Sequence, residues 1–455
     1  MTLDLAAHKH VHFVGIGGIG MSALARFLQA RGFEVSGSDR QWNDQLDGLQ
    51  ALGARVWEGH DASHLGDADL VIVTSAAAAD NPEIVAAQAR GIPVVKRAVL
   101  LATIANAGRT IAVAGTHGKT TTSALIGHIL TEAGLDPTIL IGGIGWNLGS
   151  NARVGKGEWT VVEADEYDRS FLHLRPEISV ITGVEPDHLD IYGTAEAVRE
   201  AFHLFAKETS QTVIACADDP HMHEVVNGIR ARVLTYGLEA GEWRAAEVRE
   251  KGGHTSFEVA FEGHPETYCT QLAGRHNARN ALAAATAARC AGVEPASICA
   301  AIKSFSGVER RFEIKGEEGQ VLVIDDYAHH PTEIASNLAA LKSRYGRRIV
   351  AVFQPHTYSR TQAFLDEFAR SFGDADAVYL MDVYAARETD TLGVSGRLLA
   401  ERTKQYHAGV MYTGTENDTV SQLARDLRPL DVVITMGAGD VGSLGPRLLE
   451  RLRGR

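Results

Sequence analysis

The chain has 455 residues, more than a single hydrophobic core normally organises, and at roughly 150 residues per domain its length predicts three domains. Its composition, with 45% hydrophobic residues, 46 glycines and 12 prolines, is typical of an α/β protein, and charge or glycine interrupts every apolar run before about 18 residues, so we expect no membrane insertion. The net charge of −13 argues against non-specific nucleic-acid binding.

The amino terminus carries no pattern of a targeting signal. The segment Met1-Thr-Leu-Asp-Leu lacks a basic stretch followed by an apolar core, and we therefore expect a cytoplasmic location. The cysteines lie far apart without a C-x-x-C pair, which is typical of reduced thiols and not of a disulfide framework or a zinc site. They are Cys216, Cys269, Cys290 and Cys299. The sequence leaves the oligomeric state open.

The first hundred residues alternate apolar runs with helical periodicity. Strands are predicted at residues 10–14, 34–37, 70–73 and 93–95. With a helix at residues 21–31, this alternation predicts a doubly wound parallel sheet, and we assign residues 1–106 to a Rossmann-like domain. The alternating histidines His8, His10 and His12 are expected to face solvent at the edge of a strand.

The first strand leads into the segment GIGGIG, whose glycines are Gly15, Gly17, Gly18 and Gly20. This fits G-x-G-x-x-G, and Asp39 lies near the offset expected for a ribose-binding acid. By itself the pattern favours NAD. Any nucleoside diphosphate presents a similar pyrophosphate and ribose, however, so the pattern indicates a class of ligand and not a hydride donor. A tight turn without a ligand is the alternative.

A second alternation follows a linker at residues 106–109. Strands are predicted at residues 110–114, 159–162, 178–182 and 212–215. Between residues 243 and 271, short alternating segments with glycine turns predict a small antiparallel patch, and helices are expected at residues 278–289 and 295–303. We assign residues 107–318 to a central domain.

The segment VAGTHGKTTT joins the first of these strands to a helix. It matches the P-loop only in part, because Val113 occupies the position of the first glycine. The rest of the pattern is present: Gly115 and Gly118 let backbone N–H groups approach an anion, Lys119 reaches the outer phosphates, and Thr120 offers a hydroxyl to Mg²⁺. A glycine turn is the alternative, but a turn alone does not require Lys-Thr at this point.

Two further polar groups follow strands of the same region. Glu163 ends the apolar strand at residues 159–162, where a second ligand for a phosphate-bound Mg²⁺ would come from. His188, in the segment PDHLD, follows the next strand and would add an imidazole. Strand-end acids and helix-capping residues are common, so these two positions favour a metal site only jointly with the loop.

The third region, residues 319–455, again predicts a parallel α/β arrangement. Strands are predicted at residues 321–324, 349–353, 377–381, 410–412 and 432–435. A last glycine pattern occupies residues 437–442, but only thirteen residues follow it. This is too short for a second strand with its acid, so we interpret the pattern as a packing turn.

Nine segments, in order along nearly the whole chain, resemble the Mur ligase family: HFVGIGGIGMSALA, SGSD, AGTHGKTTT, EADEYDRSFLHL, EPDHLDIY, GRHNARNALAA, GVERRFE, DDYAHHPTE and FQPHTYSRT. The resemblance implies two Rossmann-like parallel α/β domains flanking a central P-loop ATPase domain that carries the antiparallel patch. It also implies that the first domain holds a UDP-sugar, and that the third binds an amino acid and closes over ATP.

The resemblance assigns roles to individual positions. It implies ATP binding by Gly115, Thr116, His117, Gly118, Lys119, Thr120, Thr121, His276, Asn280, Arg311 and Asp326. It implies substrate binding by Gly15, Gly17, Gly18, Gly20, Met21, Ser22, Asp39, Ser75, Tyr327, His329, His356 and Arg360. Catalytic roles fall on Lys119, His188 and Arg311, and Mg²⁺, with Mn²⁺ as a substitute, would be held by Thr120, Glu163 and His188.

Two positions depart from the family pattern. Tyr167 stands where a small residue is expected, and in the segment AFHLFAK neither His203 nor Lys207 aligns with the carbamoylated lysine of sister ligases, so we do not predict that modification. A general base for the incoming amine stays unassigned.

Within the family, the resemblance is greatest to the enzymes that join L-alanine to the lactyl carboxylate of UDP-N-acetylmuramate in peptidoglycan precursor synthesis. The implied route uses ATP and an acyl phosphate. The alternative within the family is a recycling ligase that joins a murein tripeptide to the same UDP-sugar. A nicotinamide-dependent oxidoreductase would leave the second loop unexplained, and a nucleotide-switched binding protein would leave the amino-acid positions unexplained.

Overall fold

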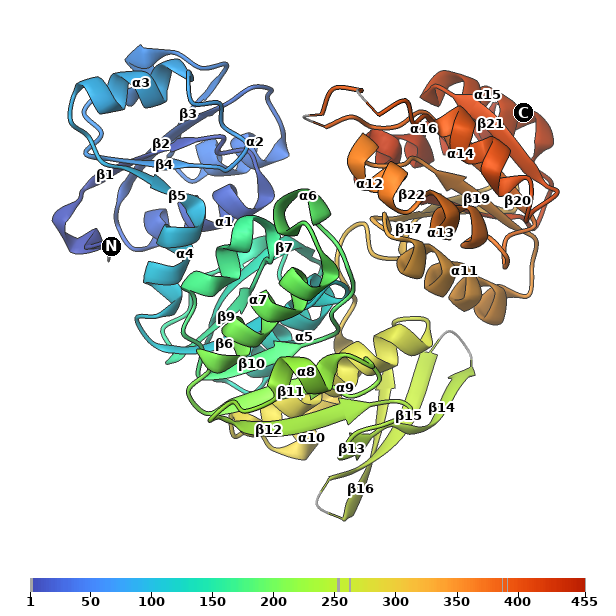
Figure 1. Cartoon of the computed structure of the whole chain (residues 1–455), viewed down its shortest axis with the longest axis horizontal. Helices are drawn as coiled ribbons and strands as arrows, with labels where there is room; N and C mark the ends of the chain where they lie inside the picture. Colours follow the sequence, from blue (N-terminus) through green and yellow to red (C-terminus); the bar gives the residue numbers. More distant parts are fainter. Residues whose placement is uncertain (1–2, 252–253, 262, 387, 391, 455) are drawn as a thin grey trace. The chain divides into compact units, whose positions relative to one another are not determined.

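The computed structural model describes residues 3–251, 254–261, 263–386, 388–390 and 392–454. Residues 1–2, 252–253 and 262, on which the predictions for the amino terminus and the antiparallel patch partly fall, lie outside the described residues. The strands form four sheets (Figure 1). Within the described ranges, every helix is too short or too polar to cross a membrane.

The amino-terminal sheet has five strands in the order β3-β2-β1-β4-β5, all parallel. Its elements are β1 (His10–Val14), β2 (Glu34–Asp39), β3 (Arg55–Glu58), β4 (Leu70–Val73), β5 (Val94–Lys96), η1 (Leu5–Ala7), α1 (Ile19–Ala30), α2 (Asp44–Ala51), η2 (Ala62–Leu65), α3 (Pro82–Ala89) and α4 (Arg97–Ala105). The strand order reverses between β1 and β4, which is where doubly wound folds bind their ligands. Helix α3 begins with Pro82 after Asn81, whose side chain accepts the N–H groups of Glu83 and Ile84.

The central sheet has eight strands in the order β13-β12-β11-β10-β6-β9-β7-β8, and only the edge strand β8 is antiparallel to its neighbour. Its strands are β6 (Arg109–Ala114), β7 (Thr138–Gly145), β8 (Ser150–Arg153), β9 (Trp159–Glu163), β10 (Ile178–Ile181), β11 (Thr212–Cys216), β12 (Arg232–Gly237) and β13 (Trp243–Arg244). The helices are α5 (Lys119–Glu132), η3 (Tyr167–His173), α6 (Leu189–Tyr192), α7 (Ala195–Lys207), α8 (Met222–Val226), α9 (Arg275–Cys290) and α10 (Pro295–Ser304).

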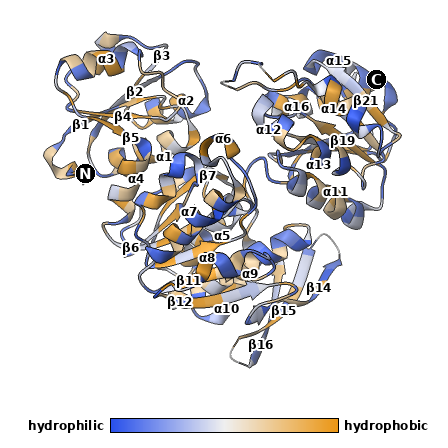
Figure 2. Cartoon of the chain, viewed as in Figure 1, coloured by the Kyte–Doolittle hydropathy of each residue, from blue (hydrophilic) through white to orange (hydrophobic). Residues whose placement is uncertain are grey.

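The hydropathy of these elements matches their positions in the fold. In Figure 2, strands β1, β4 and β11 are mainly hydrophobic, whereas helix α7 carries both colours. Helix α7 is capped by the Thr194 hydroxyl and buries one stripe, which includes Phe202 and Phe205, while Lys207 is exposed at its end. This one-sided burial is what a helix covering one face of a sheet requires.

A small sheet has the order β14-β15-β16, with β14 (Ala246–Lys251), β15 (His254–Phe261) and β16 (His264–Thr270). Its strands follow one another with connections of two residues, which only antiparallel pairs permit. The predicted antiparallel patch is therefore confirmed.

The carboxy-terminal sheet has six strands in the order β17-β18-β22-β19-β20-β21, with β17 antiparallel at one edge. Its elements are β17 (Glu313–Glu318), β18 (Val321–Asp326), β19 (Ile349–Phe353), β20 (Ala377–Met381), β21 (Val410–Gly414), β22 (Val432–Met436), α11 (Pro331–Tyr345), α12 (Tyr358–Ala363), α13 (Leu365–Arg370), α14 (Gly396–Thr403), α15 (Glu416–Asp426), η4 (Asp440–Ser443) and α16 (Leu444–Arg453). Alternate residues of β19 enter separate cores, Ala351 in one and Val352 in the other, so both faces of this sheet are covered. The predicted fold class is confirmed, while the domain boundaries stay predictions.

The prediction that the histidines of β1 face solvent is wrong. His10 is 3% exposed and His12 is fully buried. Both imidazoles contact the Ser36 hydroxyl of the neighbouring strand, His10 through Nε2 at 2.7 Å and His12 through Nδ1 at 2.8 Å. The second nitrogen of His12 lies 3.6 Å from the buried carboxylate of Glu83. Alternation of polar residues in this strand therefore marks a buried polar network, because helices cover both faces of the sheet.

Burial of His12 predicts a loss of stability in acid. Burial lowers the pKa of the His12 imidazole, and attraction by Glu83 offsets this only in part. Because the unfolded chain takes up this proton near the ordinary pKa of about 6.5 and the folded chain does so only at lower pH, stability falls as pH drops below about 6.5, by up to about 1.4 kcal/mol per pH unit. Glu83 also makes the folded chain less stable in acid, at lower pH than His12. Burial raises the pKa of its carboxyl, but interactions with His12 and Ser38 outweigh burial and lower that pKa below its ordinary value.

The measurement is the melting temperature of the wild-type chain and of His12→Asn between about pH 7.5 and about pH 5.5. Asparagine keeps a hydrogen-bonding group beside Ser36 but does not titrate, so the variant should lose less stability over this interval. Identical pH dependence of the two chains would show that His12 is not the group responsible.

Candidate functional site

The loop between β6 and α5 has a backbone that only glycine adopts readily. Gly115 has φ +136° and Gly118 has φ +80°. A Cβ atom on Gly115 would lie 2.0 Å from the Thr182 hydroxyl, and one on Gly118 would lie 2.5 Å from the side-chain oxygen of Asn280. The loop is fixed from outside as well, because the N–H of Thr116 donates to the carbonyl of Gly183 at 2.9 Å. These constraints present the start of α5, with Lys119 and Thr120, as a preformed anion-binding end.

Lys119 is held by Glu166, a carboxylate that is not among the predicted site residues. Its ammonium lies 2.8 Å from both carboxylate oxygens of Glu166 and donates to the carbonyl of Gly115 at 2.6 Å. Burial by itself would lower the pKa of Lys119, but the charges of Glu166 and Asp165 outweigh burial and raise it, so the lysine is held as a cation. Burial raises the pKa of the Glu166 carboxyl, with the attraction of Lys119 opposing it. Its position three residues after Glu163 in EADE was the available signal.

Thr120 and Glu163 lie together, as a shared metal ion requires. The Thr120 hydroxyl is 3.1 Å from Oε1 of Glu163, and Oε2 of Glu163 accepts the N–H of Gly142 at 2.7 Å. Two hard oxygen ligands at this separation suit Mg²⁺, which prefers carboxylate and hydroxyl oxygens. The donor set at this point therefore fits the predicted ion.

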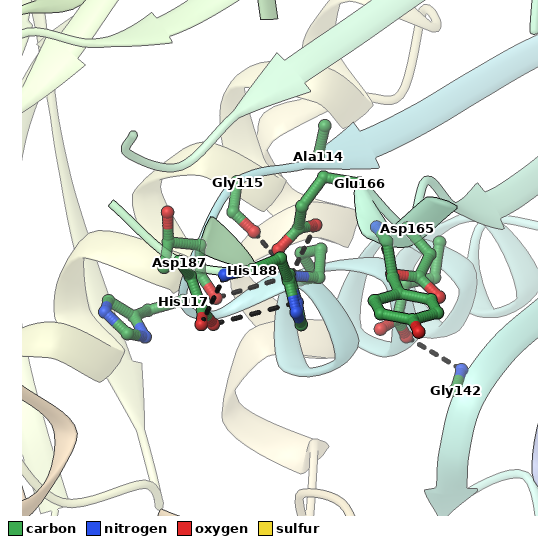
Figure 3. A network of polar contacts seen from close by, with 12 residues as sticks. Ala114, Gly115, His117, Gly142, Asp165, Glu166, Asp187 and His188 are labelled. Carbon is green, nitrogen blue, oxygen red and sulfur yellow. Dashed lines mark hydrogen bonds and ion pairs between the residues drawn. The ribbon is translucent and has the colours of Figure 1, made fainter. Parts of the chain in front are cut away.

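His188 lies in the polar network that contains Glu166 and Asp187 (Figure 3). It caps α6 in the left-handed conformation, with φ +53°, and its Nε2 lies 3.7 Å from Asp187 and 3.9 Å from Glu166. The ring of Tyr167, the residue that departs from the family pattern, meets the His188 imidazole edge-on at 5.1 Å. A strained backbone held by several contacts is typical of functional positions.

The acidic segment EADEYD also contacts the amino-terminal region. Arg97 lies 3.2 Å from Asp165, and Lys96 lies 2.8 Å from Asp168. The same arginine lies against the first glycine loop, since a Cβ atom on Gly20 would lie 2.9 Å from its guanidinium. The sequence gives no sign of a role for these two cations, because nothing in their local pattern distinguishes them.

The first glycine loop is closed by the end of β2. The Asp39 carboxylate accepts the N–H of Gly17 at 2.9 Å, and a Cβ atom on Gly17 would lie 2.9 Å from the same carboxylate. Gly18 precedes α1, so the loop presents a helix amino terminus. Inside α1, Met21 and Ser22 are buried.

Two more predicted substrate positions differ in exposure. Ser22 receives a hydrogen bond at 2.8 Å from the Asn151 amide, while Ser75 is exposed in the turn after β4. Ser75 therefore lies at the same carboxyl edge of the sheet as the glycine loop.

In the carboxy-terminal region, the structure brings the predicted positions together around the end of β18. Tyr327 and His329 meet edge-on at 5.3 Å, and the His329 and His356 rings lie 6.2 Å apart. Arg360 lies 3.4 Å from Nδ1 of His356, and the Arg311 guanidinium lies over the Tyr327 ring at 5.3 Å.

Asp326 is the buried acid of this group. Its carboxylate accepts the N–H groups of Phe312 and Ala328, both at 2.7 Å. Burial raises the pKa of Asp326 to about 6, although Arg311 draws it down. Arg311 also lies 3.6 Å from Glu333, the residue whose carboxylate closes the capping box of α11. Two carboxylates thus surround this arginine.

Other predicted nucleotide-binding residues lie at element ends. His276 lies in the first turn of α9, with Nε2 3.1 Å from the Asn277 amide, and Asn280 follows one turn later beside Gly118. Thr121 is buried in α5, and His117 lies 3.6 Å from Glu185. Asn280 and Gly118 therefore lie close together, as two parts of one nucleotide site must.

Three family models match the chain: "Mur ligase family, catalytic domain" over residues 10–109, "Mur ligase middle domain" over residues 113–288, and "Mur ligase, glutamate ligase domain" over residues 310–439. The chain is 44% identical to the UDP-N-acetylmuramate–L-alanine ligase of Salinibacter ruber, over 98% of this chain and 95% of that protein. It is also 44% identical to the ligase of the same name from Solibacter usitatus, over 98% and 96% of the two chains.

Solved structures are similar over the same length. The UDP-N-acetylmuramate-alanine ligase of Thermotoga maritima has a TM-score of 0.84 at 30% identity, covering 98% of this chain and 100% of that one. A murein peptide ligase from Psychrobacter arcticus has a TM-score of 0.73 at 27% identity, covering 98% of this chain and 99% of that one.

The glycine geometry predicts that Gly115→Ala destroys the anion site. The new methyl group would overlap the Thr182 hydroxyl and would need φ +136°, so the loop must move and nucleotide affinity should fall at least about tenfold. Gly134→Ala is the matched control, because Gly134 also has positive φ, at +77°, but has nothing within 4 Å of a new Cβ.

Calorimetric titration with ADP and the melting temperature check this prediction. The control should lose a little stability and keep its nucleotide affinity. Wild-type affinity in Gly115→Ala would contradict the assignment of the loop.

Proposed function

The chain belongs to the Mur ligase family, and from this premise we propose that it joins L-alanine to the lactyl carboxylate of UDP-N-acetylmuramate at the expense of ATP. The observation that carries the proposal is the 44% identity to L-alanine ligases over 98% of the chain. The reaction is a step of peptidoglycan precursor synthesis, and its nucleotide-linked substrates favour a cytoplasmic location.

The chemistry requires an activated acid. A carboxylate is a poor electrophile, so the route proposed is transfer of the γ-phosphoryl group of ATP to the lactyl carboxylate, with cleavage of the bond to ADP. The amine of L-alanine then attacks the carbonyl carbon of the acyl phosphate, and inorganic phosphate leaves. The first step brings two anions together, and fixed positive charge is the main way to lower its barrier.

Lys119 is the cation best placed for that task. It is held as a cation at the first position of α5, whose positive end faces the loop. Its present partner, Glu166, keeps the ammonium at a defined point beside the carbonyl of Gly115. We assign the outer phosphates of ATP to Lys119 and the backbone N–H groups of the loop.

Mg²⁺, for which Mn²⁺ can substitute, would be held by Thr120, Glu163 and His188, and when bound it compensates charge on the phosphates. Tyr167 packs against His188 and thereby limits the orientations of its imidazole. The hydrogen bond from Gly142 fixes the Glu163 carboxylate in the same way. Such supporting contacts orient ligands before an ion arrives.

The carboxy-terminal group is proposed to hold the amino acid. Arg360 can grip a carboxylate through two parallel N–H groups, which lysine cannot do. The rings of Tyr327, His329 and His356 lie next to one another beside this arginine and provide the other polar and aromatic groups of the proposed amino-acid site. We propose ATP-side roles for Arg311, Asp326 and His276 from the family pattern.

A recycling ligase of the same family is the alternative, because a murein peptide ligase has a similar fold. That structure is less similar than the L-alanine ligase of Thermotoga maritima, in both TM-score and identity. ADP release with L-alanine or with the tripeptide as acceptor separates the two functions. A preference for the tripeptide would overturn our assignment.

The first prediction from this proposal concerns omission of substrates. Purified chain with ATP, Mg²⁺, UDP-N-acetylmuramate and L-alanine should release phosphate and form the amide product, and leaving out the sugar nucleotide should abolish phosphate release, because the acceptor carboxylate is missing. Phosphate release and mass spectrometry of the product measure both. Free hydrolysis of ATP without the sugar nucleotide, or no amide bond with all reactants present, would reject the proposal.

The second prediction concerns Lys119→Ala. Removing the ammonium should lower kcat by about a thousandfold, because a fixed charge on the transferred phosphoryl group is lost. Binding of UDP-N-acetylmuramate should be largely intact, because its loop lies on another sheet. Lys207→Ala is the control, since Lys207 is exposed at the end of α7. Loss of both ligation and sugar-nucleotide binding in Lys119→Ala would contradict the separation of the two sites.

A further inference from the structure

The first region contains a fully buried carboxylate whose contacts the reaction does not explain. Glu83 lies in the first turn of α3, and its side chain has no exposed surface. Oε1 lies 3.0 Å from Nδ1 of His64 and 3.6 Å from Nε2 of His12. Oε2 lies 3.2 Å from Nδ1 of His60 and accepts the Ser38 hydroxyl at 2.6 Å. One carboxylate thus joins β1, β2, α3, η2 and the loop after β3.

The arrangement is built to hold the carboxylate and not a metal ion. The carboxylate lies among the three imidazoles, each of which already faces one of its oxygens. The amino terminus of α3 adds a favourable dipole at the same point. Trp57 stacks on the His64 ring at 4.7 Å, which fixes that imidazole from its other side. A buried charge surrounded in this way is a rigid anchor, because moving any partner leaves it unpaired.

Ser38 connects this anchor to the first glycine loop. Its hydroxyl is bound by Glu83 and lies 2.8 Å from Nδ1 of His60. Its backbone carbonyl accepts two N–H groups of the loop, from Gly15 at 2.8 Å and from Ile16 at 3.0 Å. The next residue, Asp39, accepts the N–H of Gly17. Three successive N–H groups of the loop are therefore fixed by residues 38 and 39.

The hydroxyl and the carbonyl of Ser38 bind different groups of the same domain. Glu83 and His60 hold the hydroxyl, whereas the carbonyl holds the N–H groups of the glycine loop. A loop that presents a helix amino terminus to a pyrophosphate needs its backbone in place before the ligand arrives, since ordering the loop on binding would cost affinity. The N–H groups held by Ser38 and Asp39 fix that backbone and are not themselves the groups that meet the ligand.

We propose that Glu83 is a positioning residue for the sugar nucleotide: by holding the Ser38 hydroxyl, it sets the first glycine loop in the conformation that receives the pyrophosphate. The inference rests on the proposed function, in which this loop binds UDP-N-acetylmuramate. It adds a residue that lies outside the loop and its ribose-binding acid.

The decisive variant is Ser38→Ala, which removes the link to Glu83 and keeps the carbonyl that holds the loop. Ser36→Ala is its matched control. Ser36 lies on the same strand, is equally buried, and bonds His10 and His12 of the same polar network. Its carbonyl, however, is not the acceptor of the N–H groups of Gly15 and Ile16, both of which donate to Ser38.

We expect Ser38→Ala to raise the KM for UDP-N-acetylmuramate and the Kd for UDP about tenfold, as the loss of one hydrogen bond to a charged group implies. The KM for ATP and kcat should stay within about twofold of wild type. Both serine variants should lose similar melting temperature, and Ser36→Ala should keep wild-type KM values. A purely structural role would lower the active fraction and leave every KM unchanged.

A second variant guards against loss of folding. Glu83→Gln keeps the shape and can still pair with Ser38, so its effect on the KM for the sugar nucleotide should lie between wild type and Ser38→Ala. Calorimetric titration with UDP alone measures the Kd for this loop in the absence of turnover. An unchanged UDP Kd in Ser38→Ala, or an equal rise in Ser36→Ala, would overturn the inference.

The two hypotheses fail in different ways. If wild-type chain makes no amide product from ATP, UDP-N-acetylmuramate and L-alanine, the proposed function fails. If the wild-type chain makes the product and Ser38→Ala has wild-type KM and Kd values, only the positioning role of Glu83 fails.

Discussion

Parallel pairing of neighbouring strands is the constraint on which every candidate site depends, because it brings the carboxyl ends of those strands to one edge of a sheet. In the central sheet, the order β10-β6-β9 places the loop of Gly115, the carboxylate of Glu163 and the segment of His188 after adjacent strands. In the first sheet, the neighbouring strands β1 and β2 bring Gly15 and Asp39 to one edge in the same way. Residues up to 73 positions apart in the chain, such as Gly115 and His188, are therefore brought to the same edge.

The distribution of charge among these groups decides which ligands the carboxyl edge of the sheet can bind. The segment EADEYD provides carboxylates that face different partners: Glu163 faces Thr120, Glu166 faces Lys119, and Asp165 faces Arg97. A chain of net charge −13 can still bind anionic substrates, because its local cations are held at fixed points by these acids. The buried carboxylate of Glu166 holds Lys119 in place, and Lys119 keeps that carboxylate from being an unpaired charge.

The sequence predicted most of the parallel strands with apolar runs and the glycine loops, because burial and positive φ leave clear patterns. It did not predict the edge strands β3, β8 and β17, whose residues alternate or carry charges, nor the interior strands β7 and β12. It also misjudged His10 and His12. Their alternation is what a half-exposed strand shows, and only the burial of Glu83 and Ser36 on the same side explains it. Glu166 was missed because an acid three residues beyond a strand is a weaker signal than Glu163, which ends the strand itself.

Glycine spacing alone does not separate a ligand loop from a packing turn, and the three glycine loops of this chain show what does. In the last one, Arg310 donates to the carbonyls of Gly437 and Gly439, and a Cβ atom on Gly439 would lie 2.4 Å from the Gln354 side chain. Its polar groups are thus used by the protein itself, as the interpretation as a packing turn requires. In the loops at Gly15 and Gly115, backbone carbonyls of neighbouring strand ends hold the loop: Ser38 accepts the N–H groups of Gly15 and Ile16, and Gly183 accepts the N–H of Thr116. Each of these two loops leads into the amino terminus of a helix, and a loop fixed in this way holds that helix amino terminus in position to bind an anion.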